Sequence, residues 1–346
     1  MHLRGAHPPH HGKAAGSDSS PIRVGGVPAN TRFLVIMSML QLFQTNALLG
    51  RTAKRRGRIL PYVLSLPALL VCIAILVPFV TAAVYSLQRY RLNLPYLRGF
   101  IGVDNYIDFL SDPAFWNTLR VSLTYTALTV VLELLLGLGI ALLLRRPTRF
   151  HNAVSIVLLL PLMTAPAIAA LMWKLMTNPS FGILSYLVSL FGVHDFKWAS
   201  DPSTALFTVV LVDVWVYTPF IMILLLAGLR SLPRQPFEAA ALDGVPSSFV
   251  FFRITLPMLA PYIITASLFR LLDSIQQFDI VYAMTQGGPG DRLMVFQVQA
   301  YLEFFQYTNV GRSAALLMIL WVITNILSNI FIKNWLRLRA RAHRQA

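Results

Sequence analysis

Residues Thr204–Leu229 read TALFTVVLVDVWVYTPFIMILLLAGL, a run that carries a single charged side chain, Asp213. The run is longer than the roughly 20 apolar residues that an α-helix needs to cross a bilayer, whereas a membrane strand needs only about 10. In lipid, only helices and closed barrels satisfy all their backbone hydrogen bonds. The run is therefore predicted to be a transmembrane helix.

Apolar runs of similar length recur along the chain. Hydrophobic residues make up 56% of the sequence and charged residues 12%, a balance that a water-soluble domain of 346 residues would not carry. We therefore predict an all-α membrane protein built as a bundle of six transmembrane helices. The other five runs are Ile59–Leu87, Thr118–Leu144, Ala153–Met176, Leu256–Ala283 and Arg312–Ile332.

The net charge of +15 follows the ends of these runs and does not form one patch, so it does not indicate a nucleic-acid partner. If both termini are cytoplasmic, 20 basic residues lie on the inside and eight on the outside. This asymmetry is the one that orients helical membrane proteins. It predicts that the loop after Leu229 is cytoplasmic.

The spans divide the chain into five segments. Residues 1–58 are predicted to be a largely disordered cytoplasmic tail, because residues 1–32 are rich in Gly, Pro, His and Ser. Within the tail, 33–50 is predicted to be an interfacial helix, with an extra span or a true start at Met37 or Met39 as alternatives. The first transmembrane helix (59–87), an external loop (88–117), a core of five helices (118–333) and a basic cytoplasmic tail (334–346) follow.

The loop after Leu229 contains a short predicted helix. Pro236 suits the first turn, where its missing N–H costs nothing, and Gly244 suits the position just past the end. Glu238 falls in the first turn, where a negative charge favours the helix dipole. Ala239 and Ala240 give the helix a small, smooth surface that another protein can approach closely.

The spacing within this loop, 230–257, resembles the docking loop of ABC importer permeases: Glu238-Ala-Ala, three residues, Gly244, nine residues, Ile254, one residue, Leu-Pro257. The resemblance implies a type I permease fold in which this segment is a coupling helix held by an ATPase. It implies a homologous second permease subunit, two ATPase subunits, an external sugar-binding protein and a bacterial inner membrane. The implied coupling residues are Pro236, Phe237, Glu238, Ala239, Ala240, Asp243 and Gly244.

Two further passages resemble the maltose-type, sugar-importing branch of this family. They are Gly102-Val-Asp-Asn-Tyr106 with Asp112-Pro-Ala-Phe-Trp116, and Phe278-Asp279 continuing to Gly287-Gly-Pro-Gly290. The branch implies a sugar or sugar derivative as solute. The aromatic residues Tyr106, Phe115 and Trp116 are also expected to anchor at the level of the lipid headgroups.

Charged and polar groups within the spans need a partner or a watery cavity. Arg270 and Asp273 are three residues apart on one helix and can pair. Glu133 is predicted to join a helix contact. Six residues suit either a solute path, because sugar hydroxyls need paired donors and acceptors, or hydrogen bonding between helices. They are Asp213, Tyr217, Asp273, Gln276, Gln277 and Asp279.

Prolines punctuate two of the spans. Pro161 and Pro166 predict either a broken helix or a simple kink in the third span. Pro257 and Pro261 predict a pivot at the start of the fifth.

No motif for ATP hydrolysis occurs, because Gly12-Lys13 lacks the upstream glycine and the following hydroxyl residue of a phosphate loop. No catalytic, metal or cofactor motif is apparent, so the chain is not predicted to be an enzyme. The alternative function is that of a secondary transporter driven by an ion gradient, with intramembrane carboxylates as proton carriers. Such transporters are built from inverted repeats, and none is apparent.

Overall fold

The computed structural model describes residues 64–193 and 196–345. The predicted tail 1–58, its helix 33–50 and the start of the first span lie outside the described residues. The chain divides into two units, Met1–Ile75 and Leu76–Ala346. In the first unit, the described residues 64–75 are helical and exposed.

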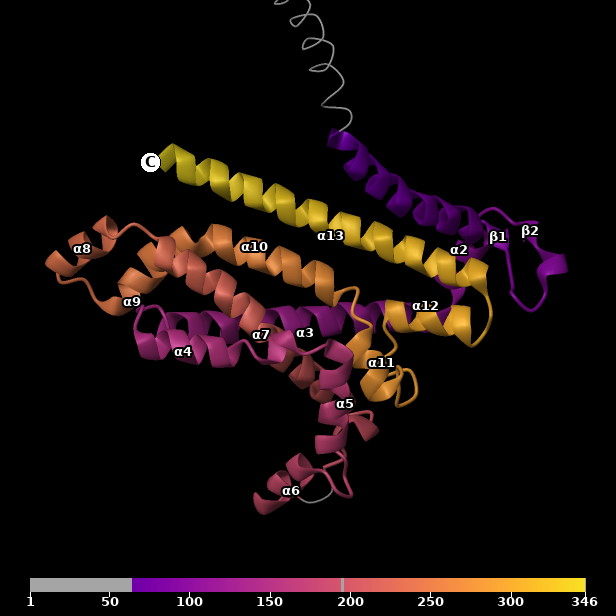
Figure 1. Ribbon diagram of the computed structural model, residues 1–346, viewed down its shortest axis with the longest axis horizontal. Coiled ribbons are helices and arrows are strands. Elements are labelled where there is room, and N and C mark those ends of the chain that lie inside the picture. The colour runs from indigo at the N-terminus through magenta and orange to yellow at the C-terminus, as the bar shows by residue number, and fades with distance from the viewer. Residues whose placement is uncertain (1–63, 194–195, 346) are drawn as a thin grey trace, which may run out of the picture. The chain divides into compact units, whose positions relative to one another are not determined.

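The regular secondary structure of the described residues is helical apart from one short hairpin, whose strands pair antiparallel with Gln88 opposite Phe100. A helix Leu64–Ser86 comes first. The remaining elements, drawn in Figure 1, are β1 (Gln88–Arg89), β2 (Gly99–Phe100), α2 (Asp104–Ser111), α3 (Pro113–Leu143), α4 (Arg149–Leu158), α5 (Pro166–Met176), α6 (Ile183–Leu190), α7 (Ala205–Ser231), α8 (Gln235–Leu242), α9 (Ser247–Phe249), η4 (Val250–Thr255), α10 (Leu256–Ser274), α11 (Asp279–Thr285), α12 (Phe296–Phe305) and α13 (Val310–Gln345).

Five helices of the described residues are long and apolar enough to cross a membrane. This confirms the predicted all-helical membrane protein, but the prediction of six single transmembrane helices is wrong in the third span. The five are Leu64–Ser86, Pro113–Leu143, Ala205–Ser231, Ser247–Ser274 and Val310–Lys333.

The third predicted span is two short helices, α4 and α5, with a 3₁₀ turn at Pro161–Met163 between them. Pro161 opens that turn and Pro166 opens α5, so each proline lies where its missing N–H is tolerated. Ala165, which precedes Pro166, has an extended ψ of 130° because the proline ring disfavours the helical region. The broken helix, and not the simple kink, is the outcome.

The fifth predicted span is displaced towards the N-terminus. Its helix covers Ser247–Ser274 and not Leu256–Ala283. Four residues, 275–278, leave the helix before α11 begins at Asp279. At the other end, η4 is a π-helical turn that joins α9 to α10 without a break, and the Thr255 hydroxyl donates to the Val250 carbonyl at 3.2 Å.

The core of the second unit is built around α3 and α7, which pack along their lengths. Gly137 on α3 makes this contact close, because a Cβ there would lie 2.7 Å from the Ile221 side chain. Buried valines of α7, including Val209, Val212 and Val216, continue the core towards α11. The helices therefore touch through small and branched side chains.

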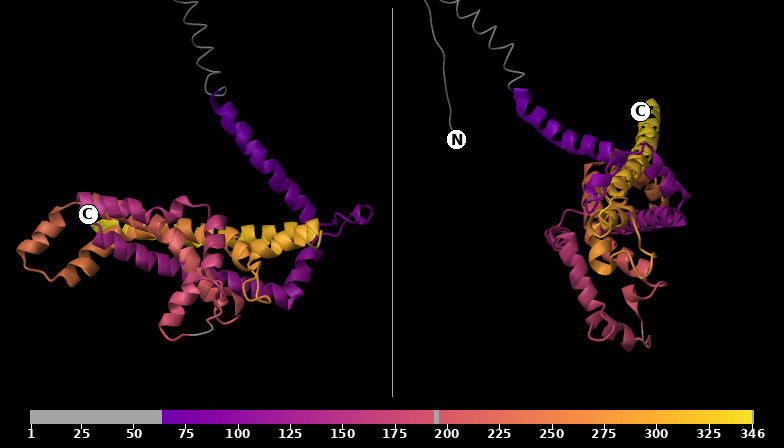
Figure 2. Two further views of the ribbon diagram at one scale, coloured as in Figure 1. Left: turned by 60° about the horizontal axis from the view of Figure 1, so that its bottom comes forward. Right: turned by 90° about the vertical axis from the view of Figure 1, so that its right-hand side faces the viewer.

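The second unit is elongated, and different elements lie at its two ends (Figures 1 and 2). The helix α8 and the C-terminal end of α13 lie at one end, and the β1–β2 hairpin lies at the other. The Arg230 guanidinium at the end of α7 donates to the Leu144 carbonyl at 3.1 Å. The end of α3 and the start of α8 therefore belong to the same end of the bundle.

Residues 102–116 pack against other elements of the described chain and do not serve only as an anchor at the membrane interface. The Asn105 amide donates to the carbonyls of Ser86 and Gln88 at 2.8 and 3.1 Å. Phe115 is buried against Phe296, with ring centroids 5.7 Å apart, so its predicted role as a headgroup anchor is wrong.

Candidate functional site

The segment after Leu229 forms the predicted short helix. It is α8, with Pro236 in its first turn and Glu238 in the position expected for a dipole-stabilising acid. At its end, Gly244 takes a φ of +66°, a left-handed conformation that favours glycine. The Val245 amide donates to the Ala240 carbonyl at 3.0 Å, and the Gly244 amide donates to the Ala241 carbonyl at 3.3 Å. These two bonds form a Schellman cap.

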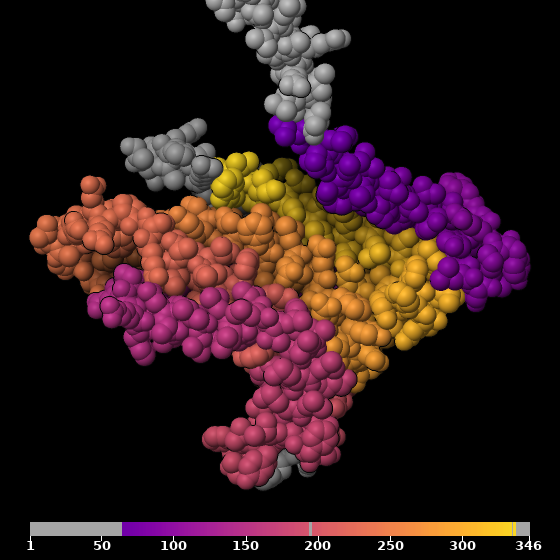
Figure 3. Space-filling model, viewed as in Figure 1, coloured from indigo at the N-terminus to yellow at the C-terminus, as the bar shows by residue number. Residues whose placement is uncertain are grey.

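One face of α8 is free of contact with the described chain. Ala240 is buried and α8 packs on the π-helical turn η4, which fixes the inner face. Glu238, Ala239 and Asp243 are exposed, and Leu242 has 89% of its surface exposed. Figure 3 shows this helix standing clear at one end of the second unit. The exposed surface of α8 therefore presents Leu242 together with the carboxylates of Glu238 and Asp243.

The intramembrane charges meet in one cluster, which we call the Arg270 cluster: Arg270, Glu133, Asp213 and Asp273. The Arg270 Nε donates to the Glu133 carboxylate at 2.5 Å, and its Nη1 donates to the Asp273 carboxylate at 2.7 Å. Its Nη2 pairs with the Asp213 carboxylate. The centroid of the Tyr217 ring lies 4.0 Å from the guanidinium carbon. The predicted Arg270–Asp273 pair and the predicted helix contact of Glu133 are confirmed.

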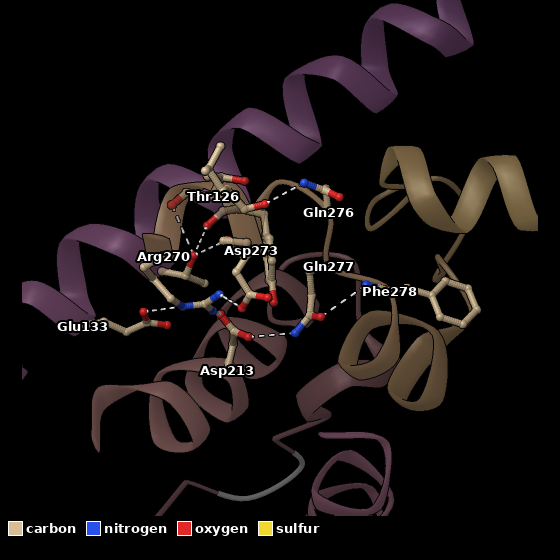
Figure 4. Close-up of polar contacts among 12 residues, drawn as sticks. Thr126, Glu133, Asp213, Arg270, Asp273, Gln276, Gln277 and Phe278 are labelled. Carbon is tan, nitrogen blue, oxygen red and sulfur yellow. Dashed lines mark hydrogen bonds and ion pairs between the residues drawn. The ribbon is translucent and has the colours of Figure 1, made fainter. Parts of the chain in front are cut away.

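This cluster ties three helices together, α3 through Glu133, α7 through Asp213 and α10 through Arg270 (Figure 4). Arg270 is only 1% exposed, and Glu133 and Asp213 are fully buried. A charge at this depth is tolerated because its partners satisfy it, and removal of one partner would leave an uncompensated buried charge.

The break after α10 is held open by side chains. The Gln277 amide donates to the Asp213 carboxylate at 3.0 Å, and its oxygen accepts the Phe278 amide hydrogen at 3.2 Å. The Ser274 and Thr129 hydroxyls hydrogen-bond at 2.8 Å and fix the last turn of α10 to α3. The bond from the Phe278 amide satisfies a backbone donor that a continuous helix would otherwise have paired, and the other two bonds join side chains.

An open cleft of about 490 Å³ lies beside this break; we call it the α10 cleft. Tyr217 reaches it from α7, Asp273 from α10, and Asp279 from the start of α11. Its full lining is Tyr217, Phe269, Leu272, Asp273, Gln276, Gln277, Phe278, Asp279 and Gln297. Tyr217, Asp273, Gln276, Gln277 and Asp279, predicted separately from the sequence, thus meet in one space.

Asp213, the sixth predicted residue, is not part of the cleft wall. It lies buried behind the wall, where it holds Arg270 and Gln277. Sequence reasoning missed Gln297 and Phe278 in the lining, because no spacing signal connects α12 with the end of α10. It also missed the pairing of Arg270 with Glu133 and Asp213. The signal for that pairing was the presence of several carboxylates and one cation within the spans, which must be neutralised.

A second hollow of about 500 Å³ adjoins the α10 cleft and shares Gln276, Phe278 and Gln297 with it. Tyr301 and Phe305 add aromatic surface, with ring centroids 4.6 Å apart. The two hollows together offer amide groups beside aromatic faces. Such a surface suits a ligand with many hydroxyl groups on an apolar ring.

Comparison with known proteins gives the family. The sequence pattern described as binding-protein-dependent transport system inner membrane component matches residues 33–341. The chain is 33% identical to the trehalose/maltose transport system permease protein of Thermococcus litoralis, a match that covers 81% of this chain and 95% of that protein. It is 32% identical to the trehalose transport system permease protein of Mycobacterium tuberculosis, covering 86% of this chain and 95% of that one.

The fold has a solved counterpart. A crystal structure of a bacterial ABC transporter involved in the import of the acidic polysaccharide alginate contains a chain that superposes with a TM-score of 0.72 at 19% identity. The match covers 83% of this chain and 99% of that one. The family works with ATPase subunits and a binding protein, which favours ATP-driven import over an ion gradient. The chain belongs to the inner-membrane components of binding-protein-dependent transport systems and is the multi-pass permease subunit of an ABC importer, not its ATPase.

Proposed function

We propose that this permease imports a sugar or sugar derivative through the α10 cleft. The observation that carries the proposal is the lining of that cleft and of the adjoining hollow by amides and aromatic rings. Sugar hydroxyls bind donors and acceptors such as Gln276 and Gln297, and the C–H faces of sugar rings stack on rings such as Tyr301. The relatives named for trehalose and maltose support the same solute class.

We propose in addition that α8 is the coupling helix. The support is its Schellman-capped geometry, its free face and the near-complete exposure of Leu242. An ATPase groove would bury Leu242 and face Glu238, while the small side chains between them let the helix approach the groove closely. Pro236, Phe237, Ala240, Asp243 and Gly244 shape and cap the helix. The other predicted coupling residue, Ala239, belongs to its exposed surface.

The orientation that fits these roles places α8 and both termini in the cytoplasm and the 88–117 loop outside, in a bacterial inner membrane. Supporting it, α8 lies at the same end as the start of α4 and the C-terminal end of α13, where basic residues gather. A homologous second permease would complete a type I pore with six crossings per subunit, the broken α4–α5 segment counting as one. Two ATPase subunits would bind the α8 helices of the two permease subunits. An external sugar-binding protein would deliver the solute, and lipid would cover the apolar outer faces of the helices.

The solute proposal is tested by uptake of radiolabelled maltose and trehalose into vesicles that contain the whole transporter with its binding protein. We expect ATP-dependent uptake of at least one of them. Replacement of the cleft residue Gln276 by Leu should lower this uptake several-fold, because a donor and an acceptor are lost. Gln306→Leu, an exposed change outside the cleft, is the matched control. ATP-driven vesicles that accumulate neither sugar would overturn the proposal.

The coupling proposal is tested by co-purification of the ATPase with the tagged permease complex. Leu242→Asp places a charge on the free face of α8 and should reduce the ATPase retained. Phe191→Asp, on an equally exposed apolar side chain (87%) that follows α6, should leave it unchanged. Full retention and full ATP-driven uptake by the Leu242 variant would exclude α8 as the docking site.

A further inference from the structure

The charged side chains that line the α10 cleft are all negative. Two carboxylates, Asp273 and Asp279, open onto it, and none of the described residues that line it is Lys or Arg. Asp279 forms no ion pair with the described part of the chain. The charge of Asp273 is paired with Arg270 behind the wall, whereas that of Asp279 is not offset by an ion pair within the described residues.

The nearest cation, Arg270, does not line the α10 cleft. Arg270 is 1% exposed, the Tyr217 ring covers its guanidinium, and three carboxylates take its N–H groups. The positive charge of Arg270 is thus already paired with carboxylates behind and beside the wall. The potential at the cleft is therefore set by the carboxylates of the wall and is negative.

Two of the amide nitrogens in the cleft wall already donate one hydrogen bond each within the protein. The Gln277 amide nitrogen donates to the Asp213 carboxylate at 3.0 Å, and the Gln276 amide nitrogen donates to the Leu272 carbonyl at 3.1 Å. Each of these two amides keeps one further N–H, and the Gln297 amide also lines the cleft, but the charged groups of the wall are both acceptors, the carboxylates of Asp273 and Asp279. Acceptors of this kind bind the hydroxyl or ammonium hydrogens of a solute, whereas an anion needs donors.

From this geometry we infer that the α10 cleft selects neutral or amino sugars and rejects acidic ones, with Asp273 and Asp279 as the residues that determine this selection. The inference rests on the proposed function of the cleft as a solute path. Rejection comes from like-charge repulsion of a uronate or sulfonate group in a partly desolvated space. A neutral sugar gains hydrogen bonds from its hydroxyls to the same carboxylates.

The test compares sugars that differ in one substituent, which is neutral, cationic or anionic. Vesicles with the whole transporter are given glucose, glucosamine and maltose, and separately glucuronate and the disaccharide in which glucuronate replaces the terminal glucose of maltose. Initial ATP-driven uptake is measured for wild type, Asp279→Asn and the Asp273→Asn/Asp279→Asn double variant. The binding protein is the same throughout, so a change in the ratio between variant and wild type reports on the permease.

We expect wild type to favour the neutral member of each pair, and the acidic-to-neutral uptake ratio to rise roughly tenfold in the double variant, as removal of charge at close range predicts. Asp291→Asn removes an exposed carboxylate that does not line the cleft and should leave the ratio unchanged. A ratio that stays at the wild-type value in both cleft variants, or wild-type preference for the acidic solutes, would overturn the inference while leaving sugar transport in place. Uptake of none of the solutes would instead defeat the proposed function itself.

Discussion

Replacement of Arg270 by methionine should destabilise the permease more than the loss of any exposed charge. The guanidinium holds Glu133 and Asp213, both fully buried, in contacts that include one of 2.5 Å. Removing one partner of a buried charge pair costs about 3–5 kcal/mol, because the remaining charges have no water to replace it. At about 2 °C per kcal/mol for a large domain, the melting temperature should fall by roughly 6–10 °C.

The assay is thermal aggregation of the purified permease complex at one fixed heating rate, because membrane complexes unfold irreversibly and the midpoint depends on the scan. Arg312→Met is the matched control. Arg312 also pairs with an acid, Glu303 at 3.2 Å, but it is 27% exposed, and such pairs contribute about 1 kcal/mol or less.

A rescue experiment distinguishes the cost of uncompensated buried charge from the cost of lost packing in Arg270→Met. Adding Glu133→Gln and Asp213→Asn to the Arg270 variant removes the uncompensated carboxylates and should restore at least half of the lost melting temperature. Such recovery is non-additive, as expected for residues within one network. If Arg270→Met were no more harmful than Arg312→Met, or if the triple variant were the least stable of all, this account of the Arg270 cluster would be refuted.

Three further predictions concern close approaches and caps. Gly137→Val should lower the melting temperature, because the new Cβ would lie 2.7 Å from Ile221 and overpacking costs about 1–3 kcal/mol. Gly139→Val is the control and should leave the melting temperature unchanged, because the space around it is open. Equal shifts for the two variants would contradict this prediction. Gly244→Val should reduce ATP-driven uptake more than Gly244→Asn, because only the second tolerates a φ of +66°, and equal uptake would argue against the cap. Gln277→Leu should cost about 1–3 kcal/mol in the same melt, by leaving a buried carboxylate oxygen and the Phe278 amide unpaired; an unchanged midpoint would show that water replaces the side chain.

Local signals predicted local structure. Pro236 and Gly244 bracket α8 as expected, because the effects of a proline at a first turn and of a glycine at a left-handed end act within a few residues. The Arg270–Asp273 pair was predictable for the same reason, since residues three apart on a helix are neighbours.

Longer-range features were less accessible. Hydropathy measures how apolar a run is and not whether its backbone is continuous, so the runs containing Pro161 and Gln277 were predicted as single spans. The partners of Arg270 on α3 and α7 are 137 and 57 residues away along the chain, and only the packing of those helices determines which acids it meets. The α10 cleft likewise needs the turn at 275–278 before its residues face one another.

The continuity of Ser247–Ser274 has a mechanical meaning. At 28 residues this helix is about 42 Å long. No loop interrupts it between η4, on which α8 packs, and Arg270, which bonds to α3 and α7. Pro257 and Pro261, predicted to be a pivot, lie within this helix and do not interrupt it. A displacement applied at its first turn would therefore reach Arg270, where it would either move α3 and α7 as well or break the ion pairs with Glu133 and Asp213. The lower-energy response would be for the three helices to move as a single block, which would shift the walls that α7 and α10 give to the α10 cleft.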